Sequence, residues 1–192
     1  MHATDAIALP EVDNGLHMIS WNARGFDELR RRGILSHKCD FELVDGLILH
    51  REGWSARHDR VVAELAARLG SLGSDRRTAV DQELRLDELD SVVTPDITVT
   101  GPDHRPVLII EVSHTAPRLD GHEKERLYAR AGIPNYWHVD LAWNVWQTHS
   151  SPHREGYGFR GSGPASRSTL TMFDGWGDIS LDELLAAADA RA

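Results

Sequence analysis

Residues 107–112 constrain the fold of this chain more strongly than any other segment. Their sequence, Val-Leu-Ile-Ile-Glu-Val, is apolar at both sets of alternating positions, with Glu111 as the exception. Because successive side chains of a strand point to opposite faces of its sheet, this strand needs cover on both faces and belongs in the centre of a sheet. A buried carboxylate there is costly unless it is paired or binds a metal, so Glu111 predicts a partner beside it.

Strand pairing offers Asp96 as that partner. If residues 96–100 and 107–113 form a hairpin centred between Asp103 and His104, opposed residues carry numbers that add up to 207, which holds for Asp96 and Glu111. Their Cβ atoms would lie about 5 Å apart on one face, where two carboxylates repel each other unless a cation lies between them. Oxygen ligands suit Mg²⁺ or Mn²⁺, so we expect one of these ions at Asp96, Glu111 and Val112.

The remaining segments alternate between helical and extended patterns, which is typical of a mixed α/β fold with a central mixed sheet flanked by helices. Residues 1–20 are expected to form a loose arm, and residues 21–192 one domain. Helices are predicted over residues 26–32, 55–72, 119–131 and from 181 onward, with Ser55 and Ser180 as caps of the second and the last. Strands are predicted over residues 41–44, 47–49, 80–86, 97–100, 107–113, 136–141, 143–148 and 170–173, and an exposed loop or a weakly paired hairpin over 150–168.

Two local signals in these segments are specific. Asp45-Gly46 between two extended runs predicts a tight hairpin turn. The apolar residues of the helix over 55–72 recur at helical spacing and predict one buried stripe, made of Val61, Val62, Leu65, Leu69 and Leu72.

The formal net charge of −9 is unfavourable for binding nucleic acid, because such binding draws on cationic side chains that neutralise phosphates. Metal-binding carboxylates account for part of this charge, since a bound cation offsets them. Arg30-Arg31-Arg32 and Arg76-Arg77 are two basic groups, although solvated surface charge is the simpler interpretation of each. The chain has no apolar run of membrane-span length, no signal-peptide pattern and one cysteine, Cys39, so we expect a cytoplasmic protein without a membrane partner.

Lys124 and Glu42 each have two interpretations. Lys124 lies four residues after Asp120 on the predicted helix, so the two side chains can form a surface pair. Lys124 can equally point at the metal and stabilise charge on a phosphate. Glu42 faces away from Phe41 and Leu43 on its predicted strand, and this spacing alone favours a solvent-facing residue.

Several motifs occur together in a fixed order along residues 20–185. They are Glu42 to Gly46, His58 at a helix start, Pro95-Asp96, Glu111-Val112 with Ser113, Asp120 to Lys124 to Tyr128, Gly132, and Tyr136-Trp137 with Asp140. This series resembles the Uma family of bacterial restriction-endonuclease-like proteins, formerly a domain of unknown function, in the PD-(D/E)xK nuclease superfamily. The resemblance implies a restriction-endonuclease-like fold, with Asp96 and Glu111 as metal ligands, Glu42 as an auxiliary carboxylate and Lys124 as the active-site lysine.

The chain departs from the expected pattern in two places. The usual nuclease signature has a lysine two residues after the glutamate, where this chain has Ser113, so Lys124 must act from the helix. Ser113 also follows Val112 directly, one residue earlier than in the family pattern.

Three functions fit these residues. The first is metal-dependent endonuclease hydrolysis of DNA phosphodiester bonds, for which analogy suggests a homodimer. The second is a non-catalytic nucleic-acid-binding or regulatory module on a nuclease-like scaffold, which the net charge favours. The third is a histidine-based metallohydrolase, but the histidines, among them His114, His122, His138, His149 and His153, show no recognised metal-binding spacing.

Four aromatic residues near the C-terminal half of the sheet also have two interpretations. Tyr136, Trp137, Trp143 and Trp146 can stack on bases. Packing within the sheet is the simpler interpretation, because Trp137 and Trp143 lie in strand-like segments.

Overall fold

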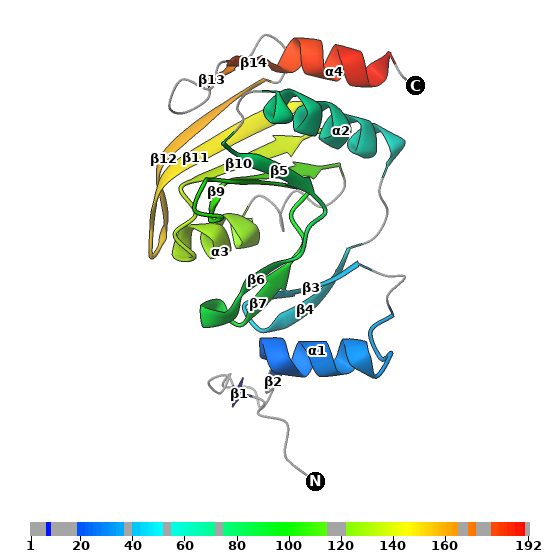
Figure 1. The fold of residues 1–192 in the computed structure, drawn as a ribbon, viewed down its shortest axis with the longest axis vertical. Helices are drawn as coiled ribbons and strands as arrows, with labels where there is room; N and C mark the ends of the chain where they lie inside the picture. The colour runs from blue at the N-terminus through cyan, green and yellow to red at the C-terminus, as the bar shows by residue number, and fades with distance from the viewer. Residues whose placement is uncertain are drawn as a thin grey trace. The chain divides into compact units, whose positions relative to one another are not determined.

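The structure is a computed structural model that describes residues 7–8, 19–36, 40–51, 55–71, 75–114, 122–164, 169–171 and 178–190 (Figure 1). The chain divides into two compact units. The first comprises Met1–Gly53 and Glu83–Thr94, and the second Trp54–Gln82 and Pro95–Ala192. Most of the expected arm, residues 1–20, lies outside the described residues.

The first unit contains a four-stranded sheet in the order β4-β3-β7-β6. Its strands are β3 (Asp40–Val44), β4 (Leu47–Arg51), β6 (Leu84–Leu86) and β7 (Ser91–Val93), with a short 3₁₀ helix, η1 (Asp87–Leu89), before β7. β1 (Ile7–Ala8) and β2 (Ile19–Ser20) pair with each other. The core of this unit consists of Ala23 and Phe26 of helix α1 (Ala23–Arg31) packed with Leu35, Leu43 and Val92.

Local sequence explains the turns of the first unit. Asp45 and Gly46 have φ angles of 49° and 78°, as the predicted Asp-Gly hairpin turn between β3 and β4 requires. A Cβ at Gly46 would lie 2.8 Å from the Cβ of Ser20, so only glycine fits there. Helix α1 (Ala23–Arg31) begins before the predicted residue 26 because the Asn22 side chain accepts the backbone N–H of Gly25 at 2.8 Å and caps the helix.

The second unit is built on a six-stranded sheet in the order β12-β11-β10-β9-β8-β5. The strands are β5 (Arg77–Val80), β8 (Ile97–Thr100), β9 (Pro106–Ser113), β10 (Asn135–Asp140), β11 (Val145–His153) and β12 (Gly156–Pro164). β9 and β10 run parallel and the other pairs antiparallel. The sheet is therefore mixed, and β9 lies inside it, as residues 107–112 predict.

Helices cover both faces of this sheet (Figure 1). Helices α2 (Ala56–Gly70) and α4 (Leu181–Asp189) lie on one face, and α3 (Lys124–Arg130) lies on the other. β13 (Thr169–Thr171) and β14 (Asp178–Ser180) form a separate pair before α4. The predicted caps are confirmed, because Ser55 Oγ accepts the N–H of His58 and Ser180 Oγ accepts that of Glu183.

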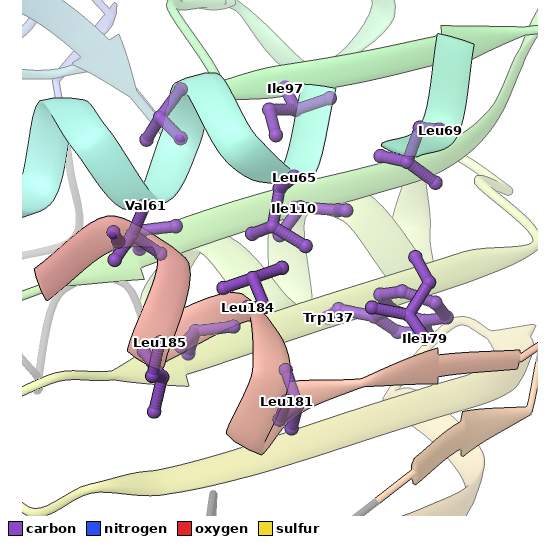
Figure 2. Close-up of a cluster of buried hydrophobic side chains, with 14 of the residues drawn as sticks. Val61, Leu65, Leu69, Ile97, Ile110, Trp137, Ile179, Leu181, Leu184 and Leu185 are labelled. Atoms are coloured by element: carbon purple, nitrogen blue, oxygen red, sulfur yellow. The ribbon is translucent and has the colours of Figure 1, made fainter. Parts of the chain in front are cut away.

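The apolar core of the second unit lies between the sheet and helices α2 and α4 (Figure 2). The predicted α2 stripe is confirmed for Val61, Val62, Leu65 and Leu69, whereas Leu72 lies outside the described residues. These side chains meet even-numbered residues of β9, such as Ile110, together with Leu181 and Leu184 of α4. The odd-numbered residues of β9, including Glu111, consequently face α3.

The predicted hairpin register is confirmed for the pair β8 and β9. Ile97 pairs with Ile110 and Val99 with Leu108, so the paired numbers add up to 207 as expected. The register shifts by one residue at Thr100, which pairs with Pro106. This irregularity lies at the turn and leaves the Asp96 end of the hairpin in the predicted register.

Several predicted boundaries are wrong. The single strand over 80–86 is two strands in different sheets, β5 and β6, because Asp81 adopts a φ of 49° and interrupts the extended chain. Of the two alternatives for residues 150–168, an exposed loop or a weakly paired hairpin, the structure supports the hairpin over residues 150–164. These residues belong to a regular hairpin that pairs from Val145 with Pro164 to His153 with Gly156. β11 begins at Val145 rather than at residue 143, because Asn144 turns with a φ of 53°.

Candidate active site

Asp96 lies at the start of β8, directly after Pro95, and its side chain is completely buried. Its Oδ2 atom accepts the backbone N–H of Val112 at 2.6 Å. This bond joins the residue before β8 to β9 and fixes the position of the carboxylate. A buried carboxylate that accepts a hydrogen bond is stabilised in its charged form.

His58, in the first turn of α2, is a further neighbour of Asp96. Its Nε2 atom lies 3.4 Å from Asp96 Oδ2, and its Nδ1 atom lies 3.2 Å from Asp59 Oδ1. Burial opposes protonation of the ring, but the two carboxylates outweigh burial and raise the pKa of His58. Sequence reasoning identified His58 only as part of a motif, although its place on the buried face of α2, one turn before Val62, was a usable signal.

Glu111 lies on β9 with a fully buried side chain, and α3 supplies its partners. Lys124 Nζ donates to Glu111 Oε1 at 3.0 Å, and Tyr128 Oη donates to the same oxygen at 2.6 Å. Lys124 and Tyr128 are one helical turn apart, so both side chains reach the same face of α3. The prediction that Glu111 needs a partner is thereby confirmed.

Lys124 is not a surface residue. Its side chain is completely buried, as is that of Glu111, and the two form an ion pair inside the second unit. The surface-pair interpretation is therefore wrong for Lys124, and Asp120 lies outside the described residues. The helical spacing alone did not show that this turn of α3 faces the sheet.

Glu42 also differs from the interpretation that its spacing favours. The residue lies on β3 in the first unit and is only 2% exposed, so it does not face solvent. Its Oε1 atom accepts the backbone N–H of Thr94 at 2.7 Å, which joins β3 to the segment after β7. Asp96, Glu111, Val112 and Lys124 all belong to the second unit.

The donor set of the second unit is compatible with a hard divalent cation. Asp96 and Glu111 offer carboxylate oxygens, and Val112, whose side chain packs in the core, can offer only its backbone carbonyl. Lys124 lies 3.0 Å from Glu111, and His58, whose pKa is raised, lies 3.4 Å from Asp96, so a divalent cation would take the place of part of this positive charge. Across the described ranges, no three His, Cys, Asp or Glu residues are grouped so that they could hold a metal.

The predicted basic group of α1 is largely neutralised by its neighbours. Arg30 forms an ion pair with Glu83, and Arg31 and Arg32 both contact Glu28. Solvated surface charge is therefore the better interpretation of this group. None of the described helices is long and apolar enough to cross a membrane.

Replacing Tyr128 with phenylalanine tests how strongly the buried charge of Glu111 depends on its donors. Hydrogen bonds to charged groups contribute about 1.5–3 kcal/mol to stability, against about 1 kcal/mol for neutral ones. Tyr157→Phe is the matched control, because Tyr157 Oη donates to the neutral carbonyl of Ile133 at 2.9 Å and is equally buried. Urea denaturation should show the larger loss for Tyr128→Phe. Equal losses of stability would mean that the hydrogen bond from Tyr128 to Glu111 is no stronger than one to a neutral acceptor.

Comparison with known proteins gives one family and one fold. The model of the Uma2 family, described as "Putative restriction endonuclease", matches residues 26–161. The structure is similar to that of "a putative nuclease belonging to DUF820" from Anabaena variabilis, with a TM-score of 0.70 and 14% sequence identity, over 87% of this chain and 98% of that one. This likeness confirms the predicted nuclease-like fold. Comparison with curated proteins gives no match.

Proposed function

Because this chain belongs to the Uma2 family of restriction-endonuclease-like proteins, we propose that it is a divalent-metal-dependent endonuclease that hydrolyses phosphodiester bonds of DNA. One observation supports metal-dependent hydrolysis in particular. Two buried carboxylates, Asp96 and Glu111, lie at the ends of adjacent strands, with the buried amine of Lys124 at 3.0 Å from one of them. This combination of groups is suited to hydrolysing a phosphodiester.

The metal would be Mg²⁺ or Mn²⁺, held by carboxylate oxygens of Asp96 and Glu111 and by the carbonyl of Val112. When bound, such an ion activates water and offsets negative charge on the phosphate. The Val112 N–H bond to Asp96 and the Tyr128 bond to Glu111 hold the two carboxylates in place before any ligand arrives. Preorganised ligands avoid the ordering cost that mobile side chains would add.

Lys124 would act on the phosphate itself. In hydrolysis the water oxygen forms a bond to phosphorus, the bond to the leaving oxygen breaks, and that oxygen takes up a proton. Negative charge grows on the nonbridging oxygens in the transition state, and an ammonium group within hydrogen-bond reach stabilises it. Burial strengthens this effect because water does not screen the lysine.

Glu42 is proposed as an auxiliary carboxylate, as the family resemblance implies. Its burial supports a role other than surface charge, and its bond to Thr94 N–H fixes one of its oxygens. We also propose a cytoplasmic protein that acts as a homodimer, because cutting both strands of a duplex needs two sites.

A non-catalytic nucleic-acid-binding or regulatory module is the second candidate. The net charge of −9 favours the regulatory form of this module, because carboxylates outnumber the cationic side chains that would neutralise phosphates by 30 to 21. The two candidates are separated by incubating the purified protein with single-stranded, double-stranded and branched DNA in Mg²⁺ and in Mn²⁺. Metal-dependent products that EDTA suppresses support the endonuclease, and binding without products supports the module.

Replacing Asp96 tests the metal directly. Asp96→Ala should abolish the binding of Mn²⁺ measured by calorimetric titration, because one of two carboxylate ligands is lost. Asp96→Asn keeps an acceptor for the Val112 N–H while removing the charge, so it should fold and still fail to bind. Asp103→Ala is the control, since Asp103 is an exposed residue of the turn between β8 and β9. Wild-type Mn²⁺ affinity in both Asp96 variants would contradict the proposed site.

A further inference from the structure

A cavity of about 550 Å³, lined mostly by polar and charged residues, lies in the second unit on the face of the sheet that α3 covers. Strands β10, β11 and β12 contribute His138, Asp140, Gln147, His149 and Arg160 to its walls. The volume is within the range of pockets that bind small molecules, about 300–1,000 Å³. None of these residues belongs to the proposed metal site.

The cavity lies on the same face of the sheet as Glu111, beginning on the neighbouring strand. His138 pairs with Glu111 in the parallel register of β9 and β10, and Gln147 pairs with His138 in the next strand. Neighbouring strands are about 4.8 Å apart, so His138 is one strand and Gln147 two strands from Glu111, all on one face. Helix α3, which carries Lys124, also contributes Glu125 to the cavity wall. The cavity and the proposed metal site are therefore neighbours on one face of the sheet.

The charges of the cavity favour a neutral polar ligand over a phosphate. Glu125 and Asp140 are acidic, and the guanidinium of Arg160 is tied to Glu125 at 2.7 Å. With neutral histidines the walls carry one net negative charge. An anion would be repelled, whereas a ring with both donors and acceptors would not.

His149 gives the clearest sign that the cavity is built for a ligand. The residue is 4% exposed, and neither ring nitrogen has a hydrogen-bond partner among the residues that the structure describes, although Nδ1 lies 3.6 Å from Glu125 Oε1. Burial lowers the pKa of His149, with Arg160 and His138 adding to the effect against Glu125, which favours the neutral ring. A neutral imidazole offers one donor and one acceptor, and leaving both unused in a buried site is costly.

Trp143 provides an aromatic surface at the same cavity. It lies in the turn between β10 and β11 and is 75% exposed, so the prediction that it packs within the sheet is wrong, whereas Tyr136 and Trp137 are buried as expected. The turn is well fixed, because Asp140 Oδ1 accepts the N–H groups of Ala142 at 2.9 Å and Trp143 at 3.0 Å. An exposed indole on a rigid turn is a platform on which a base can stack.

We propose that this cavity receives one unstacked base of the DNA strand whose phosphate is bound at Asp96, Glu111 and Lys124. Trp143 stacks on the base, and Gln147 and His149 bond to its edge. The inference rests on the proposed function, because it takes its ligand from the nucleic acid that the active site cuts. A bound base would determine which phosphodiester bond lies at the active site, because the protein then holds the strand by a base as well as by phosphates.

An abasic-site scan tests the inference. A labelled single-stranded deoxyoligonucleotide is bound in low salt with Ca²⁺ in place of Mg²⁺, so that a hard cation holds the phosphate without supporting cleavage, and an abasic nucleotide is placed at each position in turn. For the wild type, one position should weaken binding about five- to a hundredfold, which is the range expected for loss of one stacked base. In Trp143→Ala and in Gln147→Ala this dependence on position should shrink or vanish. Phe159→Ala is the control, because Phe159 is 70% exposed outside the cavity and should leave the wild-type pattern intact.

The outcomes separate this inference from the proposed nuclease function. Equal losses at all positions, or an unchanged pattern in Trp143→Ala and Gln147→Ala, overturn the base pocket even if the wild type cleaves DNA in Mn²⁺. A position-dependent loss without any cleavage supports the pocket and contradicts the endonuclease. If the oligonucleotide does not bind at all, the base pocket is overturned together with the choice of DNA as ligand.

Discussion

Replacing Lys124 with alanine is expected to lower the rate of DNA cleavage about a hundred- to a thousandfold, the effect of removing one donor that stabilises transition-state charge. The same change leaves the buried carboxylate of Glu111 without its ion-pair partner at 3.0 Å. Breaking a buried pair in this way costs about 3–5 kcal/mol, so the variant should also be less stable. Single-turnover cleavage, measured at a temperature where circular dichroism shows the variant folded, separates the two effects.

Three further variants make the Lys124 experiment decisive. Lys124→Met keeps most of the volume and should lose the same activity, while Lys124→Arg should recover little, because a planar guanidinium does not fit the space of a compact ammonium. Arg126→Ala removes a cation from an exposed position of the same helix and should cleave normally. Cleavage near the wild-type rate by folded Lys124→Met would remove Lys124 from the proposed site.

Replacing Leu65 with alanine is expected to cost about 2–5 kcal/mol of unfolding free energy, because the side chain is completely buried between α2 and the sheet (Figure 2). The neighbouring core side chains are fixed by their own packing, so they cannot move to fill the cavity that the substitution leaves. Urea denaturation followed by tryptophan fluorescence measures the loss. Leu47→Ala makes the same chemical change at a residue that is 39% exposed and should cost far less. Equal losses at the two positions would mean that the α2 face does not stabilise the unit.

The centre of the fold could be predicted because its determinants are local. The two-sided apolar pattern of residues 107–112 identified a central strand, and the short hairpin fixed the pairing of β8 with β9. Helix α2 was predictable because its cap and its apolar stripe lie within one segment. In each case a few adjacent residues contain the whole signal.

The parts that were missed depend on contacts between distant segments. The contact between His58 and Asp96 joins residues on α2 and before β8, and no spacing within either segment indicates it. Likewise, the burial of Lys124 depends on how α3 lies against β9. The hairpin of β11 and β12 is a local contact that was offered as one alternative, and only its regularity was underestimated. Serine, glycine and proline are common in loops, whereas the backbone hydrogen bonds of a hairpin do not depend on those side chains.

The parallel pairing of β9 with β10 has a consequence for how the site arises. Two parallel neighbours require a crossover connection, and such crossovers are right-handed in about 98% of cases. The connection here contains α3, so the handedness of the chain decides which face of β9 receives Lys124 and Tyr128. The handedness of the crossover thus gives the two faces of β9 different neighbours and different roles. Odd-numbered positions such as Glu111 become available for chemistry, and even-numbered positions such as Ile110 become available for packing.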